Sequence, residues 1–407
     1  MKIRTRRLSK RPIIVMCYVG LVIILGIAYW LIQNGYHNNS SNSSLQPRPT
    51  TPSQQNVTTT PSETRIRVAA MGDMLAHDTI VANAKTANGY DFGKYFANIR
   101  SLYTDTDIVF CNQEGLSSGA TYGITGYPAF NAPTEFASGL QSGAGCNLIN
   151  LANNHMGDKG AAATNATVAE WESLQPLAYA GANRSEAEQN TVRYFTVKDI
   201  KFSFLAFADF NNNRATPAYN VNNYHDTALV NRLVQEARQK SDIVLVSMHW
   251  GTEDSAVPNS DQAQQVQQLA ALGVDMVIGT GPHVLQPVAK VERPDGKQMT
   301  VWYSLGNMLS SQLNAPQLFS GIAHFNVVKN NESGQSTIDS LSFIPTYMHY
   351  EWTAAEQAQG NLLARTNVMI YPLSSAAEPL SKTRLNTTVE AQQAYIRSVL
   401  GPLVTVR

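Results

Sequence analysis

Clusters of basic residues are absent beyond position 11, although the 407-residue chain contains 30 Lys and Arg residues and 30 Asp and Glu residues. Six of the basic residues lie within the first eleven positions, so the rest of the chain carries more acidic than basic side chains. A nucleic-acid-binding surface needs clustered Lys and Arg to neutralise phosphates. The sequence therefore excludes nucleic acid as a partner.

Cysteine is rare, with three residues in the chain, and Cys17 lies in a long apolar run. The other two, Cys111 and Cys146, fall in the part that we expect to fold. They are able to form one disulfide, but a chain with so few cysteines favours unpaired ones. We therefore expect buried thiols, with a single disulfide as the alternative.

Charge is missing from residues 13–32, a run long enough to cross the roughly 30 Å of bilayer hydrocarbon as one helix. The basic residues before it favour the cytoplasm, and Tyr29 and Trp30 suit the outer interface. A cleaved signal peptide is the alternative, but its apolar stretch is shorter and ends in small residues. We predict a cytoplasmic tail (1–12), a single-pass anchor in the cell membrane (13–32) and an extracellular main domain.

Apolar side chains are few in the next segment, which is rich in Gln, Asn, Ser, Thr and Pro. Such a composition cannot bury enough surface to fold, so we predict a disordered linker over 33–63. A folded domain over 64–373 follows, and then a tail over 374–407 with one helix near 389–400.

The folded part alternates short apolar runs with helical stretches, which predicts the α/β class. The expected helices cover 133–143, 161–174, 227–240 and 260–272. A hairpin is expected over 194–208. The expected strands cover 66–70, 107–111, 147–151, 242–248, 275–278 and 300–304, with further strands at 322–328, 340–344 and 367–371.

Nearly every expected strand runs into a motif rich in Asp, Asn, Glu or His. Any one motif by itself is more often a helix cap or a local hydrogen bond than a site. Because the carboxyl ends of strands lie along one edge of an open α/β sheet, we expect the motifs to converge there. The motifs are Gly72-Asp73-Met74, Asn112-Gln113-Glu114-Gly115, Ala152-Asn153-Asn154-His155, His249-Trp250-Gly251-Thr252-Glu253, Gly281-Pro282-His283-Val284 and Ser304-Leu305-Gly306-Asn307.

This mixture of oxygen and imidazole groups suits a divalent Mn, Fe or Zn ion better than Ca or Mg. A serine nucleophile is less favoured, because no Gly-x-Ser-x-Gly elbow frames any serine near these motifs. Phosphate-cradling and dinucleotide fingerprints are also missing. We therefore predict a metal site.

In this order and spacing, the motifs resemble the CapA-type capsule and poly-gamma-glutamate biosynthesis proteins over residues 64–350. The domain of that family is similar to the calcineurin-like metallophosphoesterases. The resemblance implies a metallophosphatase-like layered α/β sandwich. It also implies metal ligation by Asp73, Glu114, Asn154, His249 and His283, and catalytic roles for His155, Asp73 and Glu114, with His155 as the acid.

Two positions depart from the phosphoesterase pattern that this resemblance implies. Leu75 and Gly281 each stand where that pattern has a histidine, so each metal would lose one ligand. His77 would replace the first of them if its loop folded inward, and is otherwise an exposed residue at a helix start. Residues expected to orient the ligands are Asn112, Glu253, His77 and Asn307.

Two hypotheses about function follow from the resemblance. The first is a metal-dependent hydrolase or transferase that acts outside the cell on an anionic envelope polymer or its precursor, in capsule or poly-gamma-glutamate biosynthesis, export or wall attachment. The second is a noncatalytic subunit that binds the polymer or organises a membrane synthase. The expected partners are the polymer, the bilayer through residues 13–32, and subunits of such a synthase.

Overall fold

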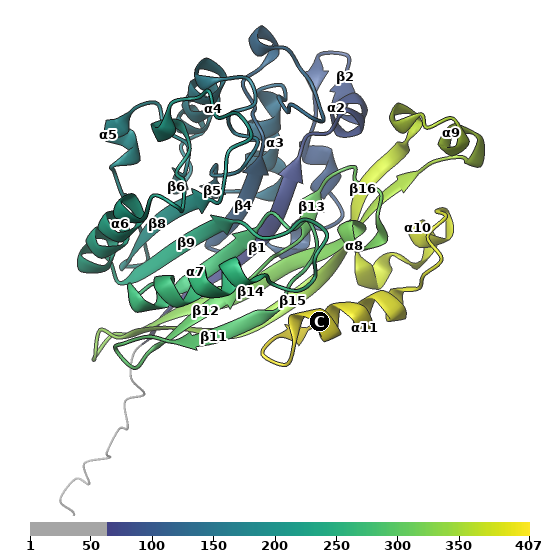
Figure 1. Ribbon diagram of the computed structural model, residues 1–407. Coiled ribbons are helices and arrows are strands. Elements are labelled where there is room, and N and C mark those ends of the chain that lie inside the picture. Colours follow the sequence, from purple (N-terminus) through teal and green to yellow (C-terminus); the bar gives the residue numbers. More distant parts are fainter. Residues whose placement is uncertain (1–62) are drawn as a thin grey trace, which may run out of the picture. The chain divides into compact units, whose positions relative to one another are not determined.

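Two mixed β-sheets form the centre of the computed structural model, which describes residues 63–407 (Figure 1). In the first sheet, β1 runs parallel to β4 and antiparallel to β14. In order across the sheet, its strands are β16 (Thr366–Pro372), β15 (Ser336–Glu351), β14 (Phe319–Asn330), β1 (Glu63–Leu75), β4 (Ile108–Glu114), β5 (Leu148–Asn150) and β6 (Ala178–Ala180), with β13 (Asn307–Leu309) beside β1 and β17 (Thr405–Val406) beside β15.

The second sheet has parallel strands in its middle and antiparallel strands at both edges. Its strands, in order, are β11 (Val288–Glu292), β12 (Gln298–Trp302), β10 (Met276–Thr280), β9 (Ile243–His249), β8 (Ile200–Ala208) and β7 (Arg193–Val197). A separate pair is formed by β2 (Lys85–Thr86) and β3 (Gly89–Tyr90).

The two sheets pack against each other, because alternate residues of each strand point to opposite faces. On β8, Phe202 and Phe204 join the core between the sheets, whereas Leu205 and Phe207 face helices. Phe204 packs edge-on against Phe110 of β4 at 6.1 Å between ring centroids. The near-continuous apolar runs of the middle strands are thus buried on both faces.

Helices cover the outer faces of the sheets (Figure 1). Leu229 and Leu233 of α6 and Leu269 of α7 pack on the second sheet. The α-helices are α2 (Asp78–Ala84), α3 (Glu135–Ala144), α4 (Ala161–Leu174), α5 (Glu186–Gln189), α6 (Thr227–Lys240), α7 (Ser260–Ala271), α8 (Ala315–Leu318), α9 (Ala354–Ala358), α10 (Ala377–Ser381) and α11 (Val389–Leu400). Short 3-10 helices are η1 (Gly93–Phe96), η2 (Arg100–Leu102), η3 (Ala120–Tyr122), η4 (Ala218–Asn220), η5 (Leu362–Ala364) and η6 (Leu373–Ser375).

The predicted α/β class is confirmed, and every strand and helix expected within residues 63–407 is present. The tail after residue 373 is more structured than expected, because α10 and β17 accompany the expected α11. Ile396 and Leu400 of α11 join the main core.

The predicted anchor (13–32) and the predicted linker lie outside the described residues, apart from Glu63, which opens β1. Among residues 63–407, no helix has both the length and the apolar character needed to cross a bilayer.

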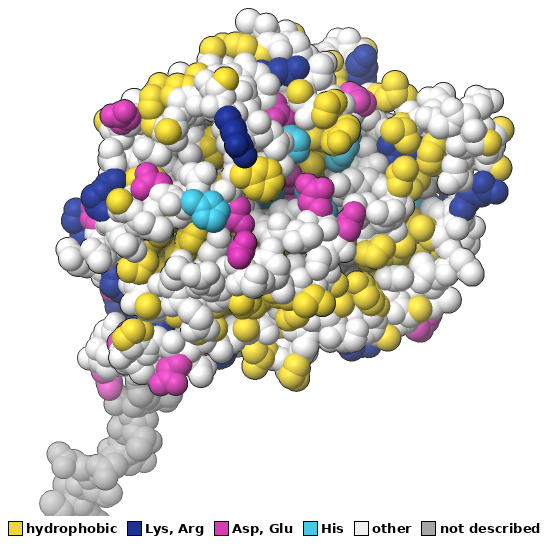
Figure 2. All heavy atoms as spheres, viewed as in Figure 1, with side chains coloured by type: hydrophobic (Ala, Val, Ile, Leu, Met, Phe, Trp, Pro, Cys, Tyr) yellow, Lys and Arg dark blue, Asp and Glu magenta, His cyan; other side chains and the backbone are white. Residues whose placement is uncertain are grey.

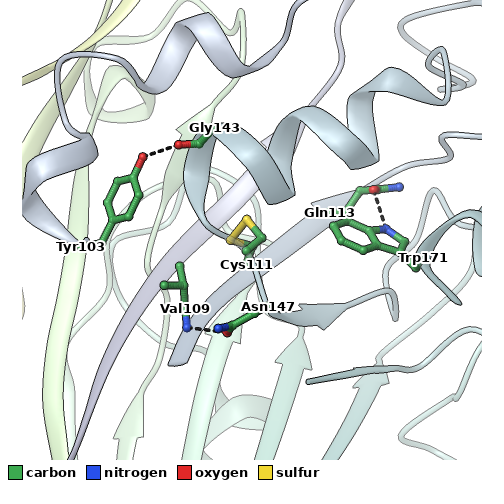
Figure 3. The surroundings of a disulfide bond; sticks show 8 residues. Tyr103, Val109, Cys111, Gln113, Gly143, Asn147 and Trp171 are labelled. Atoms are coloured by element: carbon green, nitrogen blue, oxygen red, sulfur yellow. Dashed lines mark hydrogen bonds between the residues drawn. A yellow bond between two sulfur atoms is a disulfide. The ribbon is translucent and has the colours of Figure 1, made fainter. Parts of the chain in front are cut away.

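The expectation of buried thiols was wrong, because Cys111 and Cys146 form a disulfide (Figure 3). Cys111 lies on β4 and Cys146 just before its neighbour β5, which brings the two Cα atoms to 5.7 Å. This separation lies in the range that a disulfide requires. The pairing of β4 with β5 created the contact, and a sequence count of cysteines did not reveal it.

Candidate metal centre

The motif residues meet where the carboxyl ends of the strands of both sheets come together. Asp73 and Glu114 come from β1 and β4 of the first sheet, and His249 ends β9 of the second. The expectation that the motifs share one sheet edge was therefore wrong. Packing of the two sheets brings the strand ends of the second sheet beside those of the first. On the face drawn in Figure 2, histidine and acidic side chains gather near the centre of the view.

Asp73 is fully buried and holds several hydrogen bonds. Its Oδ1 accepts from Asn112 Nδ2 at 2.7 Å, and the Gly281 N–H lies 3.2 Å from Oδ2. The preceding residue, Gly72, has no room for a side chain, because a Cβ there would lie 1.9 Å from the carbonyl oxygen of Gly306. This close approach, with the Asp73 N–H donating to Gly306 O at 2.8 Å, fixes the end of β1.

Glu114 is buried, with 1% of its surface exposed, and neither carboxylate oxygen has a hydrogen-bond partner among the described residues. Two histidine nitrogens lie near it, His249 Nε2 at 3.7 Å and His283 Nε2 at 3.8 Å from Oε1. A buried carboxylate without a partner is costly. A bound cation would therefore stabilise the carboxylate of Glu114.

His283 lies in a fixed orientation. Its Nδ1 is 3.1 Å from both Asp73 Oδ2 and Asn307 Oδ1, two acceptors, so this nitrogen carries the proton. Asn307 is itself held with its amide nitrogen donating to Gln312 Oε1 at 2.6 Å. The Nε2 atom of His283 consequently faces Glu114.

His249 and Asn154 form the next part of the centre. His249 Nε2 lies 3.0 Å from Asn154 Oδ1, and His249 Nδ1 lies 3.1 Å from Thr280 Oγ1. Ligand atoms of Asp73, Glu114 and His249 all lie within 4.8 Å of one another. This buried group has the size and the donor atoms of a metal site.

His155 lies beside this group and pairs with a residue that the sequence reasoning missed. Its Nδ1 is 2.8 Å from Oδ2 of Asp158, which also accepts the Phe130 N–H at 2.7 Å. Phe130 packs edge-on against the imidazole at 4.7 Å. Asp158 follows His155 by three residues in the same turn. This short spacing in the sequence could have identified it as the partner of His155.

The residues expected to orient the ligands fall into two groups. Asn112 and Asn307 contact Asp73 and His283 directly, as described above. His77 begins α2, and its Nδ1 accepts from the Ser311 N–H at 3.4 Å. Glu253 is exposed in the turn after β9. Among the described residues, neither His77 nor Glu253 makes a hydrogen bond with the ligand group.

The two departures from the phosphoesterase pattern have structural explanations. Leu75 is a buried apolar residue at the end of β1. Gly281 has φ +107°, and a Cβ there would lie 2.8 Å from the carbonyl oxygen of Trp250. No histidine fits this backbone without rearrangement, and the Gly281 N–H bonds to Asp73 instead.

Burial and the close charges perturb the protonation of the centre. Burial raises the pKa of Glu114 and lowers that of His249 to about 3. Burial would also lower the pKa of His283, but Glu114 and Asp73 raise it to about 10. Burial opposes ionisation of Asp73 too, yet the hydrogen bond and charge of His283 keep its pKa below the ordinary value.

These observations fit a divalent metal. His249 is neutral, the form in which imidazole binds a metal. Glu114 offers two oxygens without hydrogen bonds among residues 63–407, and Asn154 adds an amide oxygen beside His249. A cation would satisfy the atoms that the chain leaves without partners.

The family described as bacterial capsule synthesis protein PGA_cap matches residues 67–312, more than half of the chain. The PGA biosynthesis protein CapA of Bacillus subtilis (strain 168) is 29% identical over 186 residues, which cover 45% of this chain and 47% of that protein. The capsule biosynthesis protein CapA of Bacillus anthracis is 28% identical over 175 residues, which cover 42% and 41%. The chain thus spans less than half the length of each of these relatives.

Among solved structures, a phosphatase from Mycoplasma pneumoniae aligns with 70% of this chain and 94% of its own, at 12% identity and a TM-score of 0.41.

Proposed function

The chain belongs to the PGA_cap family of bacterial capsule synthesis proteins, and from this premise we propose that it is a metal-dependent hydrolase or transferase of the cell envelope. Its substrate would be an anionic capsule polymer such as poly-gamma-glutamate, or a precursor of it. Residues 13–32 would anchor it in the cell membrane, with the folded domain outside and near the subunits of a membrane synthase.

The observation that carries the proposal is the carboxylate of Glu114, buried and without a hydrogen bond among the described residues, between His249 and His283. A structural role would be served by an apolar residue, since burying a carboxylate that accepts no hydrogen bond costs several kcal/mol by order of magnitude. Retaining the carboxylate in this position is expected of a ligand for a cation.

The residues of the centre have two roles, to hold a metal and to orient His283. A bound divalent metal supplies a Lewis acid that polarises a substrate oxygen and activates water. Glu114, His249 and Asn154 would hold it, while Asp73 and Asn307 fix the ring of His283.

His155 supplies the proton that this chemistry needs. Its Nδ1 is engaged by Asp158, so Nε2 is the atom left to hold or release a proton. The metal centre therefore combines a cation site with an acid.

The disulfide Cys111–Cys146 supports the proposed location outside the cytoplasm. Disulfides persist in oxidising compartments and are rare in the cytosol, where thiol systems keep cysteines reduced. The charge-free run 13–32, preceded by six basic residues, supports a membrane anchor of this orientation.

One observation favours a second candidate function, a noncatalytic subunit that binds the polymer or organises a synthase. Asp73 is hydrogen-bonded by Asn112, Gly281 and His283, so its oxygens are less available to a metal than those of Glu114. In this alternative the residues of the centre bind the polymer.

Metal content of the purified full-length protein separates the two functions. After loading with Mn, Fe or Zn and removal of free metal, we expect one tightly held ion per chain, lost in Glu114→Gln and in His249→Ala. His225→Ala is the matched control, because His225 is exposed and pairs with Asp209, which is not one of the ligand residues. If no loading gives bound metal in the wild type, the metal-dependent function is rejected and the binding role remains.

A generic phosphodiester substrate tests how broad the activity is. We expect little or no hydrolysis, because the pattern of a two-metal phosphatase is incomplete at Leu75 and Gly281. Brisk metal-dependent turnover of such a substrate would contradict the restriction to an envelope polymer.

A further inference from the structure

A polar pocket of about 350 Å³ lies at the outer edge of the first sheet, and none of its lining residues belongs to the metal centre. Its walls come from the end of α2, from η1, from the adjacent strands β15 and β16, and from α10, which lies near this edge in Figure 1. Its polar lining includes Asn83, Lys94, His349, Glu351, Glu378 and Lys382.

One wall of the pocket carries a positive charge without a counter-charge. The Nζ of Lys94 donates to the carbonyl oxygen of Asn83, and within residues 63–407 no carboxylate lies within ion-pair distance of it. An ammonium has three N–H donors, so two remain for a ligand. The side chain amide of Asn83 uses its nitrogen on backbone oxygens, which leaves its own oxygen toward new donors.

A second group of lining side chains carries an excess of negative charge. Lys382 lies 2.6 Å from Glu378 and 4.0 Å from Glu351, so one ammonium serves two carboxylates. Glu351 also accepts from Asn367 Nδ2 at 2.9 Å. The pocket is thus close to neutral as a whole, but its two walls differ in charge.

The imidazole of His349 lines the pocket beside Glu351 and is 2% exposed. Its Nε2 lies 3.5 Å from Glu351 Oε1, and its Nδ1 has no hydrogen-bond partner among the described residues. The rings of Tyr347 and Tyr371 pack edge-on against it at 5.7 and 5.8 Å. A buried polar atom without a partner is costly, so this position favours a polar occupant.

We infer that this pocket binds a free α-amino acid as its zwitterion, with the carboxylate at Lys94 and the ammonium at Glu351 and Glu378. A ligand with anionic groups alone would meet the two glutamates, and a purely cationic ligand would meet Lys94 and Lys382. A zwitterion satisfies both walls. The site is separate from the metal centre, so it goes beyond the proposed function.

Calorimetric titration of the full-length protein with L-glutamine tests this inference. L-Glutamine has both charges and a neutral amide side chain, whereas N-acetyl-L-glutamine lacks the ammonium and L-glutamine amide lacks the α-carboxylate. We expect saturable binding of L-glutamine and binding of both blocked forms that is weaker by about tenfold or more. Absence of saturable binding, or equal binding of the blocked forms, would overturn the inference.

Two variants assign the binding to this pocket. Lys94→Met and Glu351→Gln should each weaken L-glutamine binding by about tenfold, because each removes one charged partner. Lys85→Met is the matched control, since Lys85 is an exposed lysine of β2 outside the pocket. Unchanged binding in both pocket variants would contradict the assignment. Metal content should be the same in all three variants, so failure here is distinguishable from failure of the proposed function.

Discussion

At the scale of single residues, Gly281 decides how complete the metal centre is. Its backbone at φ +107° brings its N–H toward Asp73, and the space that a side chain needs is taken by Trp250. The absence of a histidine here is therefore built into the backbone. Restoring the ligand by substitution conflicts with the path of the chain.

Gly281→Ala should destabilise the protein by about 3 kcal/mol, from the strained φ together with the clash against Trp250. Gly296→Ala is the control, because Gly296 has φ +76° with no atom within 4 Å of an added Cβ, and it should lose about 1 kcal/mol. Urea denaturation measures both. Equal losses in the two variants would contradict the role given to the clash, and Gly281→His should not raise metal content.

The disulfide is a second feature of residue scale. Cys111 and Cys146 close a loop with a sequence separation of 35, which restricts the unfolded chain. Replacing both with serine should lower the free energy of unfolding by about 3 to 4 kcal/mol. Denaturation with and without dithiothreitol checks this, since the reductant should weaken the wild type and leave the double variant unchanged.

At the scale of elements, β14 carries a partly buried histidine whose ionisation opposes folding. His324 pairs across the sheet with Ser342 of β15, and burial lowers its pKa to about 4, with a smaller contribution from Arg407. The folded state therefore holds His324 neutral where the unfolded chain would bind a proton. This group's contribution to stability is full above pH 6.5 and is lost as the pH falls toward 4.

His324→Gln should reduce the loss of stability between pH 7 and pH 4.5 by about 1 to 2 kcal/mol. Denaturant midpoints at the two pH values measure the difference. The control is His225→Gln, because His225 is exposed and its replacement should leave the pH dependence as in the wild type. If both variants behave alike, burial of His324 does not shape the acid response.

At the scale of the whole molecule, the centre ties the two sheets together. Asp73 and Glu114 belong to the first sheet, whereas His249 and His283 follow strands of the second. A metal held by Glu114 of the first sheet and His249 of the second would stabilise the packing of the sheets by about 2.7 kcal/mol when its free concentration is 100 times the dissociation constant. Without metal, the Glu114 carboxyl group, which has no hydrogen bond among the described residues, weakens the same interface.

Which of the wild type and Glu114→Gln is the more stable protein should therefore depend on whether metal is present. In a chelator the variant should be more stable than the wild type, by about 1 to 3 kcal/mol, because a neutral amide is less costly to bury. In excess Mn or Zn the wild type should be the more stable protein. Thermal unfolding in both conditions reads this out, and an unchanged order would argue against metal binding at Glu114.

The sequence by itself determined the main strands and helices within residues 63–407 and the residues of the motifs, but not the shorter elements such as β6, β11 and β13. Local apolar periodicity fixes where elements lie, so α4 and α6 begin and end at the predicted residues. Asp73, Glu114 and His249 were identifiable because each lies at or near the end of a strand, a relation between neighbours in the chain.

Tertiary structure alone decided which of these neighbours meet. The gathering of the motifs from two sheets, the bond between Cys111 and Cys146, and the blocked side-chain position at Gly281 depend on contacts between distant segments. The pocket beside β16 is formed by α2 and η1 together with α10, which lies far from them in the chain. Patterns along a sequence report local geometry, whereas the packing of sheets and the charges it brings together arise when the chain has folded.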